Sequence, residues 1–159
     1  MGLEIERKFL INKQLWQAPN KGQHLAQGYI AANAHKLSVR IRIADDTAWL
    51  NLKGWINDIS RHEYEYPIPI SDARELLNNF AGSIVEKIRY QVDYAGHTWE
   101  VDEFLGDNAG LMVAEIELDS EAQEFDKPDW IAKEVSDDPR YLNTSLAQMP
   151  FSKWDREDK

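Results

Sequence analysis

The chain has 159 residues and a formal net charge of −10, because 28 acidic residues outnumber 18 basic ones. This acidic excess argues against nucleic acid and anionic membranes as partners, since both bind proteins through cationic surfaces. The sequence contains no cysteine, which excludes disulfides and thiolate metal sites, and its 43% hydrophobic content predicts a packed core.

Alternating hydrophobic and polar residues predict β-strands along most of the chain. Leu37, Val39 and Ile41, for example, alternate with polar residues. The dipeptide Ala95-Gly96 is expected to form a tight hairpin between two such strands. The expected strands cover residues 3–11, 24–32, 37–43, 47–53, 61–70, 84–94, 97–104 and 111–119.

Few helices are expected. Residues 71–81 carry a hydrophobic stripe at helical spacing, with Ser71 as the expected N-cap and Gly82 just past the C-terminal end. A last short helix is expected over residues 141–148. About eight antiparallel strands with few helices favour a mainly β (α+β) domain, either a closed eight-stranded antiparallel β-barrel or a sandwich.

The chain reads as one domain over residues 1–154, followed by a tail at 155–159 that we expect to fray. Nothing resembles a signal peptide, and no apolar run approaches the roughly 20 residues that span a bilayer. We therefore expect a cytoplasmic protein that does not bind membranes. The sequence leaves the oligomeric state open, a homodimer included.

Ionised residues two positions apart recur along the expected strands. Such residues project to the same face, about 6.6 Å apart. The basic pairs are Arg40 with Arg42 and Lys87 with Arg89, and the acidic pairs are Glu4 with Glu6, Glu63 with Glu65, Glu100 with Asp102 and Glu115 with Glu117. Like charges held this close repel, so this segregation by sign predicts a partner of opposite charge beside each pair.

Each kind of pair suits one ligand chemistry. Neighbouring carboxylates bind hard cations such as Mg²⁺ or Mn²⁺, whereas rows of arginine and lysine bind phosphate oxygens. A site that needs both is a metal–polyphosphate site. If the charged faces pointed into a barrel, this site would lie in its lumen, and the apolar faces would need a cover that the helices could partly supply.

The segment Glu4-Ile5-Glu6-Arg7-Lys8 resembles the E-x-E-x-K signature of the CYTH superfamily, the triphosphate tunnel metalloenzymes. Further segments that resemble the family follow in its order, at Val39–Arg42, Lys53, Glu63–Glu65, Glu86–Tyr90, Glu100–Asp102, Glu115–Glu117, Lys133–Ser136 and Arg140–Asn143. The resemblance covers residues 3 to about 147. Ser136 departs from it mildly, because threonine is usual there.

The resemblance implies an eight-stranded antiparallel tunnel that binds a triphosphate together with Mg²⁺ or Mn²⁺. The residues that it implies as metal ligands or nearby contributors are Glu4, Glu6, Glu63, Glu65, Asp102, Glu115 and Glu117. Those that it implies for phosphate binding are Lys8, Arg40, Arg42, Lys53, Lys87 and Arg89. Two more residues are added by strand parity, that is, because they lie an even number of positions from a site residue on the same strand and so project to the same face. They are Arg61 in the phosphate-binding set and Glu100 in the acidic set.

The resemblance further implies metal-dependent hydrolysis of a triphosphate, most simply inorganic tripolyphosphate, by a metal-activated water. Glu6, Lys8 and Lys87 are the candidate catalytic residues. Glu6 or a neighbouring carboxylate would orient the water, and Lys87 or Lys8 would stabilise the leaving phosphate.

The charged motifs leave other functions open. An adenylate cyclase of the CYTH type and a thiamine-triphosphatase would use the same phosphate-binding residues. A module that binds polyphosphate or nucleotide without turnover belongs to a different class. Solvated strand faces with no ligand are a further alternative, because charged faces are common on antiparallel sheets.

Overall fold

The computed structural model describes residues 2–33, 36–155, 157 and 159. Its strands are β1 (Glu4–Ile11), β2 (Gln23–Ala32), β3 (Leu37–Ala44), β4 (Thr47–Trp55), β5 (Ser60–Ile68), β6 (Val85–Tyr94), β7 (His97–Phe104), β8 (Met112–Glu117) and β9 (Ile131–Glu134). Its helices are α1 (Ile70–Phe80) and α2 (Asn143–Gln148), with short 3₁₀ turns η1 (Gly106–Asn108), η2 (Pro139–Tyr141) and η3 (Phe151–Lys153).

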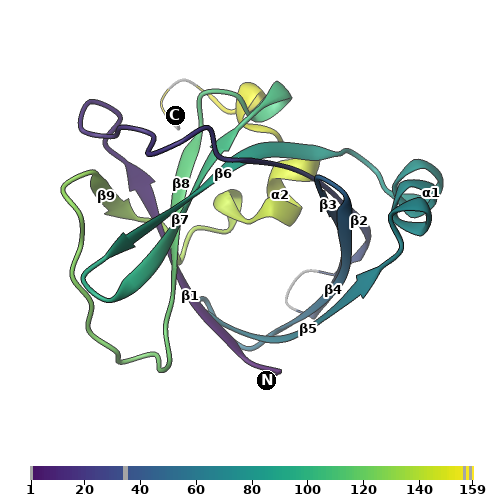
Figure 1. Ribbon diagram of the computed structural model, residues 1–159, viewed down its shortest axis with the longest axis horizontal. Helices are drawn as coiled ribbons and strands as arrows, with labels where there is room; N and C mark the ends of the chain where they lie inside the picture. Colours follow the sequence, from purple (N-terminus) through teal and green to yellow (C-terminus); the bar gives the residue numbers. More distant parts are fainter. Residues whose placement is uncertain (1, 34–35, 156, 158) are drawn as a thin grey trace.

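Strands β1 to β8 close into an antiparallel barrel (Figure 1). Around the ring the order is β1-β5-β4-β3-β2-β6-β7-β8, and β8 returns to β1. The closing contact pairs Glu4 with Arg61 and Ile5 with Ser60. At the predicted hairpin, Ala95 and Gly96 both have positive φ, 49° and 84°, as a tight turn between twisted strands requires. The predicted eight-stranded barrel is confirmed, and the sandwich alternative is wrong.

A ninth strand was not predicted. The first half of β1 pairs with β5, whereas its second half pairs with β9, through Phe9 with Glu134 and Ile11 with Ile131. Strand β9 therefore covers the part of the β1 edge that β5 leaves open. Its four residues are too few for the alternating pattern that identified the other strands.

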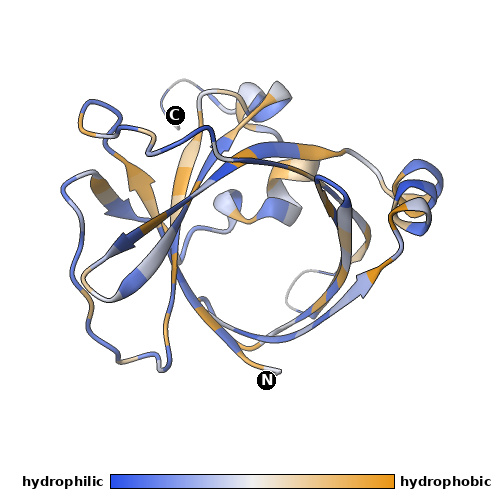
Figure 2. Ribbon diagram, viewed as in Figure 1, coloured by the Kyte–Doolittle hydropathy of each residue, from blue (hydrophilic) through white to orange (hydrophobic). Residues whose placement is uncertain are grey.

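Hydrophilic and hydrophobic residues alternate along the barrel strands (Figure 2). On β1, β7 and β8 the apolar set faces out of the barrel and includes Phe9, Trp99 and Ile116, all at most 1% exposed. Loop aromatics, among them Trp16 and Phe125, pack over this face rather than the expected helices. Phe9 meets Trp99 edge to face, with 5.6 Å between the ring centroids. This packing leaves the polar face of the same strands for the lumen.

Helix α1 packs outside the barrel against β2, β3 and β4, with Ala73 in one apolar cluster with Ile41 and Ala48. It begins at Ile70, and Pro69 occupies the N-cap position without a side-chain bond. The predicted capping role of Ser71 is therefore wrong. The predicted C-terminal stop is also different, because Ala81 ends the helix in an extended conformation and Gly82 is not in the left-handed region.

The C-terminal segment fills one end of the barrel. Its residues Tyr141, Leu146 and Trp154 pack against Val85 and Val113 in a second apolar cluster. This packing places α2 within the ring of strands (Figure 1). Of the predicted tail, residues 156 and 158 lie outside the described residues, and the domain boundary stays a prediction.

Within the described part of the chain, no helix combines the length and apolar character needed to cross a membrane.

Candidate active site

The polar faces of the strands line a lumen cavity of about 600 Å³. Strand parity brings together every residue of the predicted site except Asp102, from all strands of the ring but β2. The predicted residues that line the cavity are Glu4, Glu6, Lys8, Arg40, Arg42, Lys53, Arg61, Glu63, Glu65, Lys87, Arg89, Glu100, Glu115 and Glu117.

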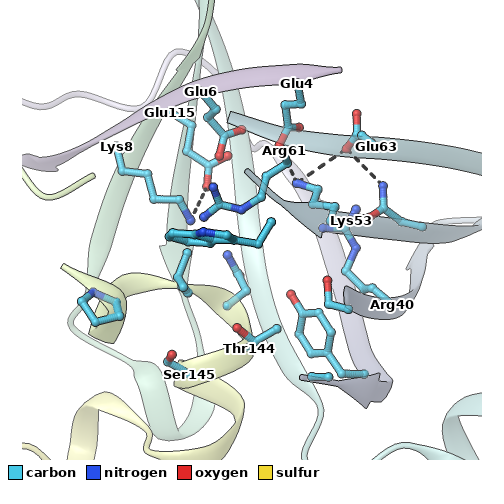
Figure 3. Close-up of a pocket in the computed structure, with 18 of the residues that line it drawn as sticks. Glu4, Glu6, Lys8, Arg40, Lys53, Arg61, Glu63, Glu115, Thr144 and Ser145 are labelled. Carbon is cyan, nitrogen blue, oxygen red and sulfur yellow. Dashed lines mark hydrogen bonds and ion pairs between the residues drawn. The ribbon is translucent and has the colours of Figure 1, made fainter. Parts of the chain in front are cut away.

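Carboxylates gather where β1 and β8 run side by side (Figure 3). Glu6 lies opposite Glu117 and Lys8 lies opposite Glu115 in the strand register. Burial, together with the charges of Glu115 and Glu4, raises the pKa of Glu6 well above its ordinary value. Burial also raises the pKa of Glu117, and the charge of Glu4 adds to the effect. Burial and the neighbouring carboxylates thus both disfavour the charged forms of Glu6 and Glu117.

Glu115 behaves differently from its neighbours. Burial alone would raise its pKa, but Lys8 and Arg89 lower it well below its ordinary value. Lys8 Nζ lies 3.6 Å from Glu115 Oε1, and Arg89 Nη2 lies 3.7 Å from Glu115 Oε2. A hydrogen bond with the Glu6 side chain contributes in the same direction. Glu6 and Glu115 are thus close enough to share a proton.

Lys53, on β4, bridges a second group of acids, which lie on β1 and β5. Its Nζ lies 2.9 Å from Glu4 Oε1 and 3.6 Å from Glu63 Oε2. Burial lowers the pKa of Lys53, but Glu4 and Glu6 outweigh this and raise it above its ordinary value. Asn51 donates from Nδ2 to Glu63 Oε2 at 3.1 Å, and also to a neighbouring carboxylate, Glu65, at 3.0 Å. Asn51 therefore orients both glutamates of β5.

Asp102 lies behind the cavity wall and is fully buried. One carboxylate oxygen, Oδ2, is 2.7 Å from Lys87 Nζ and accepts from Arg89 Nη2 at 2.8 Å, while Oδ1 accepts from Arg89 Nε at 2.8 Å. Burial would raise the pKa of Asp102, but Arg89 and Lys87 lower it to about 2. In this arrangement Asp102 anchors two bases, and its role as a metal ligand, which would require it to leave them, stays a prediction.

Cations are crowded on the β3 and β6 side of the lumen. Burial lowers the pKa of Lys87 to about 7, with Arg89 and Arg42 contributing and Asp102 opposing. Burial likewise lowers the pKa of Arg42 to about 10, and Arg40 and Arg89 add to the effect. Positive charges that repel one another in a buried wall are suited to a polyanion.

Arg61 occupies a distinct setting beside the hairpin that joins β4 to β5. Its guanidinium carbon lies 4.3 Å from the centroid of the Trp55 ring. Its Nη1 donates to the backbone oxygens of Asn57 and Ser60, the latter at 3.0 Å. Arg61 faces the cavity and is held by these aromatic and backbone contacts.

The donor set suits a hard divalent cation. In the described ranges, no three acidic or histidine side chains already stand in coordination geometry. The chemistry nevertheless fits, because Glu4, Glu6 and Glu115 are neighbouring oxygen donors, Glu4 and Glu115 are buried, and burial together with the charges of Glu115 and Glu4 raises the pKa of Glu6. A cation would relieve this repulsion, although Glu4 and Glu115 would then exchange their lysine partners for it.

Sequence reasoning missed several residues that face the cavity. Asn51 shares the strand parity of Lys53, so the alternation that identified Lys53 also contained the signal for Asn51. Thr144 and Ser145 face the cavity from α2 (Figure 3). Nothing in their local sequence indicates the lumen, because only tertiary packing places α2 there.

Comparison with known proteins agrees with this geometry. The model of the CYTH domain family matches residues 2–148. An inorganic triphosphatase from Acetivibrio thermocellus is 48% identical over 152 residues, which cover 95% of this chain and 97% of that protein. An inorganic triphosphatase from Nitrosomonas europaea is 36% identical over 151 residues, which cover 91% of this chain and 96% of that protein. A crystal structure of an inorganic triphosphatase is 34% identical, with a TM-score of 0.65 over 91% of this chain and 93% of that one. The chain therefore belongs to the CYTH domain family.

Proposed function

We propose that the protein hydrolyses inorganic tripolyphosphate with the help of Mg²⁺ or Mn²⁺ bound in the barrel lumen. The observation that carries this proposal is a 600 Å³ cavity lined by basic and acidic side chains that come from β1 and from β3 to β8. The two curated relatives, at 48% and 36% identity, are both named inorganic triphosphatase, which supports the same substrate.

The charge of the cavity explains why anion and cation would bind together. Eight bases and ten acids line it, so the wall has two more negative than positive side chains. A polyphosphate without a cation would be repelled by this excess of negative charge. A complex of polyphosphate and divalent cation supplies oxygens for the bases and positive charge for the acids, and it thereby replaces the ion pairs that now join strands along the lumen wall.

Each side of the cavity would take one part of this complex. Arg40, Arg42 and Arg89 would bind phosphate oxygens, since guanidinium groups match them with paired N–H donors. The carboxylates of β1 and β8, chiefly Glu6 and Glu115, would hold the cation. CYTH triphosphatases in general depend on metal. When bound, such a cation polarises phosphate oxygens and makes a nucleophilic water available near neutral pH.

The chain's own residues position the reacting groups. Glu6, between Glu4 and Lys8 on β1, would orient the attacking water through its carboxylate. Lys87 Nζ, fixed by Asp102 at 2.7 Å, would stabilise the charge on the leaving phosphate, and Lys8 would do so from β1. Catalysis would then consist mainly of positioning and electrostatic stabilisation.

Phosphate release from tripolyphosphate, ATP and thiamine triphosphate tests the proposal directly. Each substrate is assayed with Mg²⁺, with Mn²⁺ and with chelator. We expect release from tripolyphosphate to be fastest and to stop in chelator. Faster release from thiamine triphosphate would favour a thiamine-triphosphatase, and cyclic AMP formed from ATP would favour a cyclase.

A non-catalytic binding module is the alternative from a different class. It would bind tripolyphosphate in the calorimeter but release no phosphate with either metal. The ten acids of the cavity argue against it, because binding of a phosphate anion alone does not require a largely carboxylate wall.

A further inference from the structure

A buried chain of hydrogen bonds joins two cavity bases through two amide side chains, Gln27 on β2 and Asn143 at the start of α2. Gln27 is fully buried, and its Oε1 accepts from Arg42 Nε at 2.9 Å. Its Nε2 donates to Asn143 Oδ1 at 3.2 Å. The same Asn143 oxygen accepts from Lys87 Nζ at 3.0 Å. The amides therefore connect a base of β3 to a base of β6.

Neutral partners suit bases that must bind an anion. Lys8, Lys53 and Arg40 pair with carboxylates, at 3.6, 2.9 and 3.5 Å. A carboxylate partner cancels much of the positive charge that it holds in place, whereas an amide oxygen fixes a base and leaves its charge for the ligand. Arg42 is held by an amide in this way. Lys87 Nζ has both kinds of partner, the Asp102 carboxylate at 2.7 Å and the Asn143 amide oxygen at 3.0 Å, and the amide adds a contact that cancels none of its charge.

Helix α2 fixes the amide chain in space. Leu146, one turn along from Asn143, is 1% exposed within the apolar cluster that fills this end of the barrel. The position of Asn143 therefore depends on hydrophobic packing rather than on the charged groups that it contacts. Through Asn143, the packing of the C-terminal segment helps to fix the positions of Lys87 and, by way of Gln27, Arg42.

We propose that Gln27 and Asn143 are positioning residues that hold Arg42 and Lys87 in the geometry that binds triphosphate. This inference depends on the proposed function, because it takes Arg42 and Lys87 as phosphate-binding groups. It adds Gln27 of β2 to the machinery of the site, and it gives a role to Asn143, the last residue of the segment Arg140–Asn143 that resembles the family.

A double-mutant cycle on tripolyphosphate affinity tests the inference. The affinity is taken from the KM for tripolyphosphate in phosphate-release assays at saturating Mg²⁺, with kcat recorded beside it, for wild type, Asn143→Ala, Lys87→Met and the double variant. We expect Asn143→Ala to weaken binding about tenfold, the typical value of a hydrogen bond to a charged group. In the Lys87→Met background the same change should alter affinity by less than about twofold, because its partner is gone.

A second cycle tests the other end of the chain. Gln27→Met keeps the volume of the buried side chain but removes the acceptor for Arg42. It should weaken binding in the wild type and have little effect beside Arg42→Met. This cycle also decides the question if Lys87→Met, which leaves Asp102 with one base fewer, does not fold. Met149→Ala, at an exposed position that ends α2, is the matched control and should bind as wild type.

The outcomes separate this inference from the function on which it depends. If the wild type does not bind or hydrolyse tripolyphosphate, the proposed function fails. If the wild type binds and Lys87→Met and Arg42→Met weaken binding while both amide variants bind normally, only the inference is overturned. Equal losses from an amide substitution with and without its basic partner would indicate a general structural role, and they would also overturn it.

Discussion

Replacing Asp102 by asparagine removes one negative charge from a buried site while keeping its shape. Asp102 and Lys87 are both fully buried, and the Asp102 carboxylate contacts Lys87 and Arg89 at 2.7–2.8 Å. Loss of one partner from a buried ion pair costs about 3–5 kcal/mol, because the remaining charge is left uncompensated. At ~2–4 °C per kcal/mol for a chain of this size, Asp102→Asn should lower the unfolding temperature by about 6–20 °C.

Thermal unfolding in metal-free buffer, followed by circular dichroism, measures this effect. The matched control is Glu86→Gln, which breaks a contact between His24 and Glu86 whose side chains are about half exposed. This change should cost less than about 1 kcal/mol, as expected for a surface pair. If Asp102→Asn unfolds at the wild-type temperature without metal, and differs only when Mg²⁺ is added, Asp102 is a metal ligand rather than the anchor of the two bases.

Three further predictions follow from the same cavity. Arg40→Ala should raise the KM for tripolyphosphate about tenfold or more through loss of charged hydrogen bonds, while Arg74→Ala, on the exposed face of α1, should leave it unchanged; equal KM values would contradict the assignment. Glu117→Ala should lose metal-dependent phosphate release at limiting Mg²⁺. Turnover at the wild-type rate under this condition would show that Glu117 is not a metal ligand. Hydrogen bonds from Arg140 lower the pKa of Asp138, so the stability that Asp138 contributes is present above the ordinary aspartate pKa and is lost as pH falls through the lower folded value. The unfolding temperatures of wild type and Asp138→Asn should therefore differ at pH 7 and converge in acid, and a constant difference would contradict this reasoning.

The alternation of residues along the strands predicted which charged side chains share one face, but it left both a barrel and a sandwich open, and the family resemblance decided for the closed barrel. Because side chains in a strand alternate strictly, one correct strand fixes the face of each of its residues. The pairs Arg40 with Arg42 and Glu115 with Glu117, which are far apart in the sequence, line the same cavity as predicted. The repulsion within each pair was the signal that a partner of opposite charge lay nearby.

The parity of a residue along its strand does not predict how deeply its side chain is buried or which side chains it contacts. Asp102 has the parity of Glu100, which faces the cavity, yet Asp102 lies opposite Arg89 and is enclosed by Arg89 and Lys87. The residue that lies opposite on β6 differs, Arg89 for Asp102 and Gln91 for Glu100, and the sequence of β7 alone contains no information about this register. The same holds for Asn143, whose place in the lumen depends on the packing of α2.

Helix termini were predicted least well. Ser71 has the chemistry of an N-cap, but the helix begins at Ile70, directly after Pro69. The extended conformation of Pro69 already turns the chain from β5 into the helix, so no capping side chain is needed. Local preferences at a helix end are worth about 1 kcal/mol, which tertiary packing readily overrides.

The central claim is that acids and bases of one lumen act together on a metal–tripolyphosphate complex. The most direct test is the rate of phosphate release from tripolyphosphate by the wild type over a titration of Mg²⁺. The account predicts no release in chelator and a rate that rises with Mg²⁺ to saturation. Release that is unaffected by chelator, or no release at any Mg²⁺ or Mn²⁺ concentration, would contradict it.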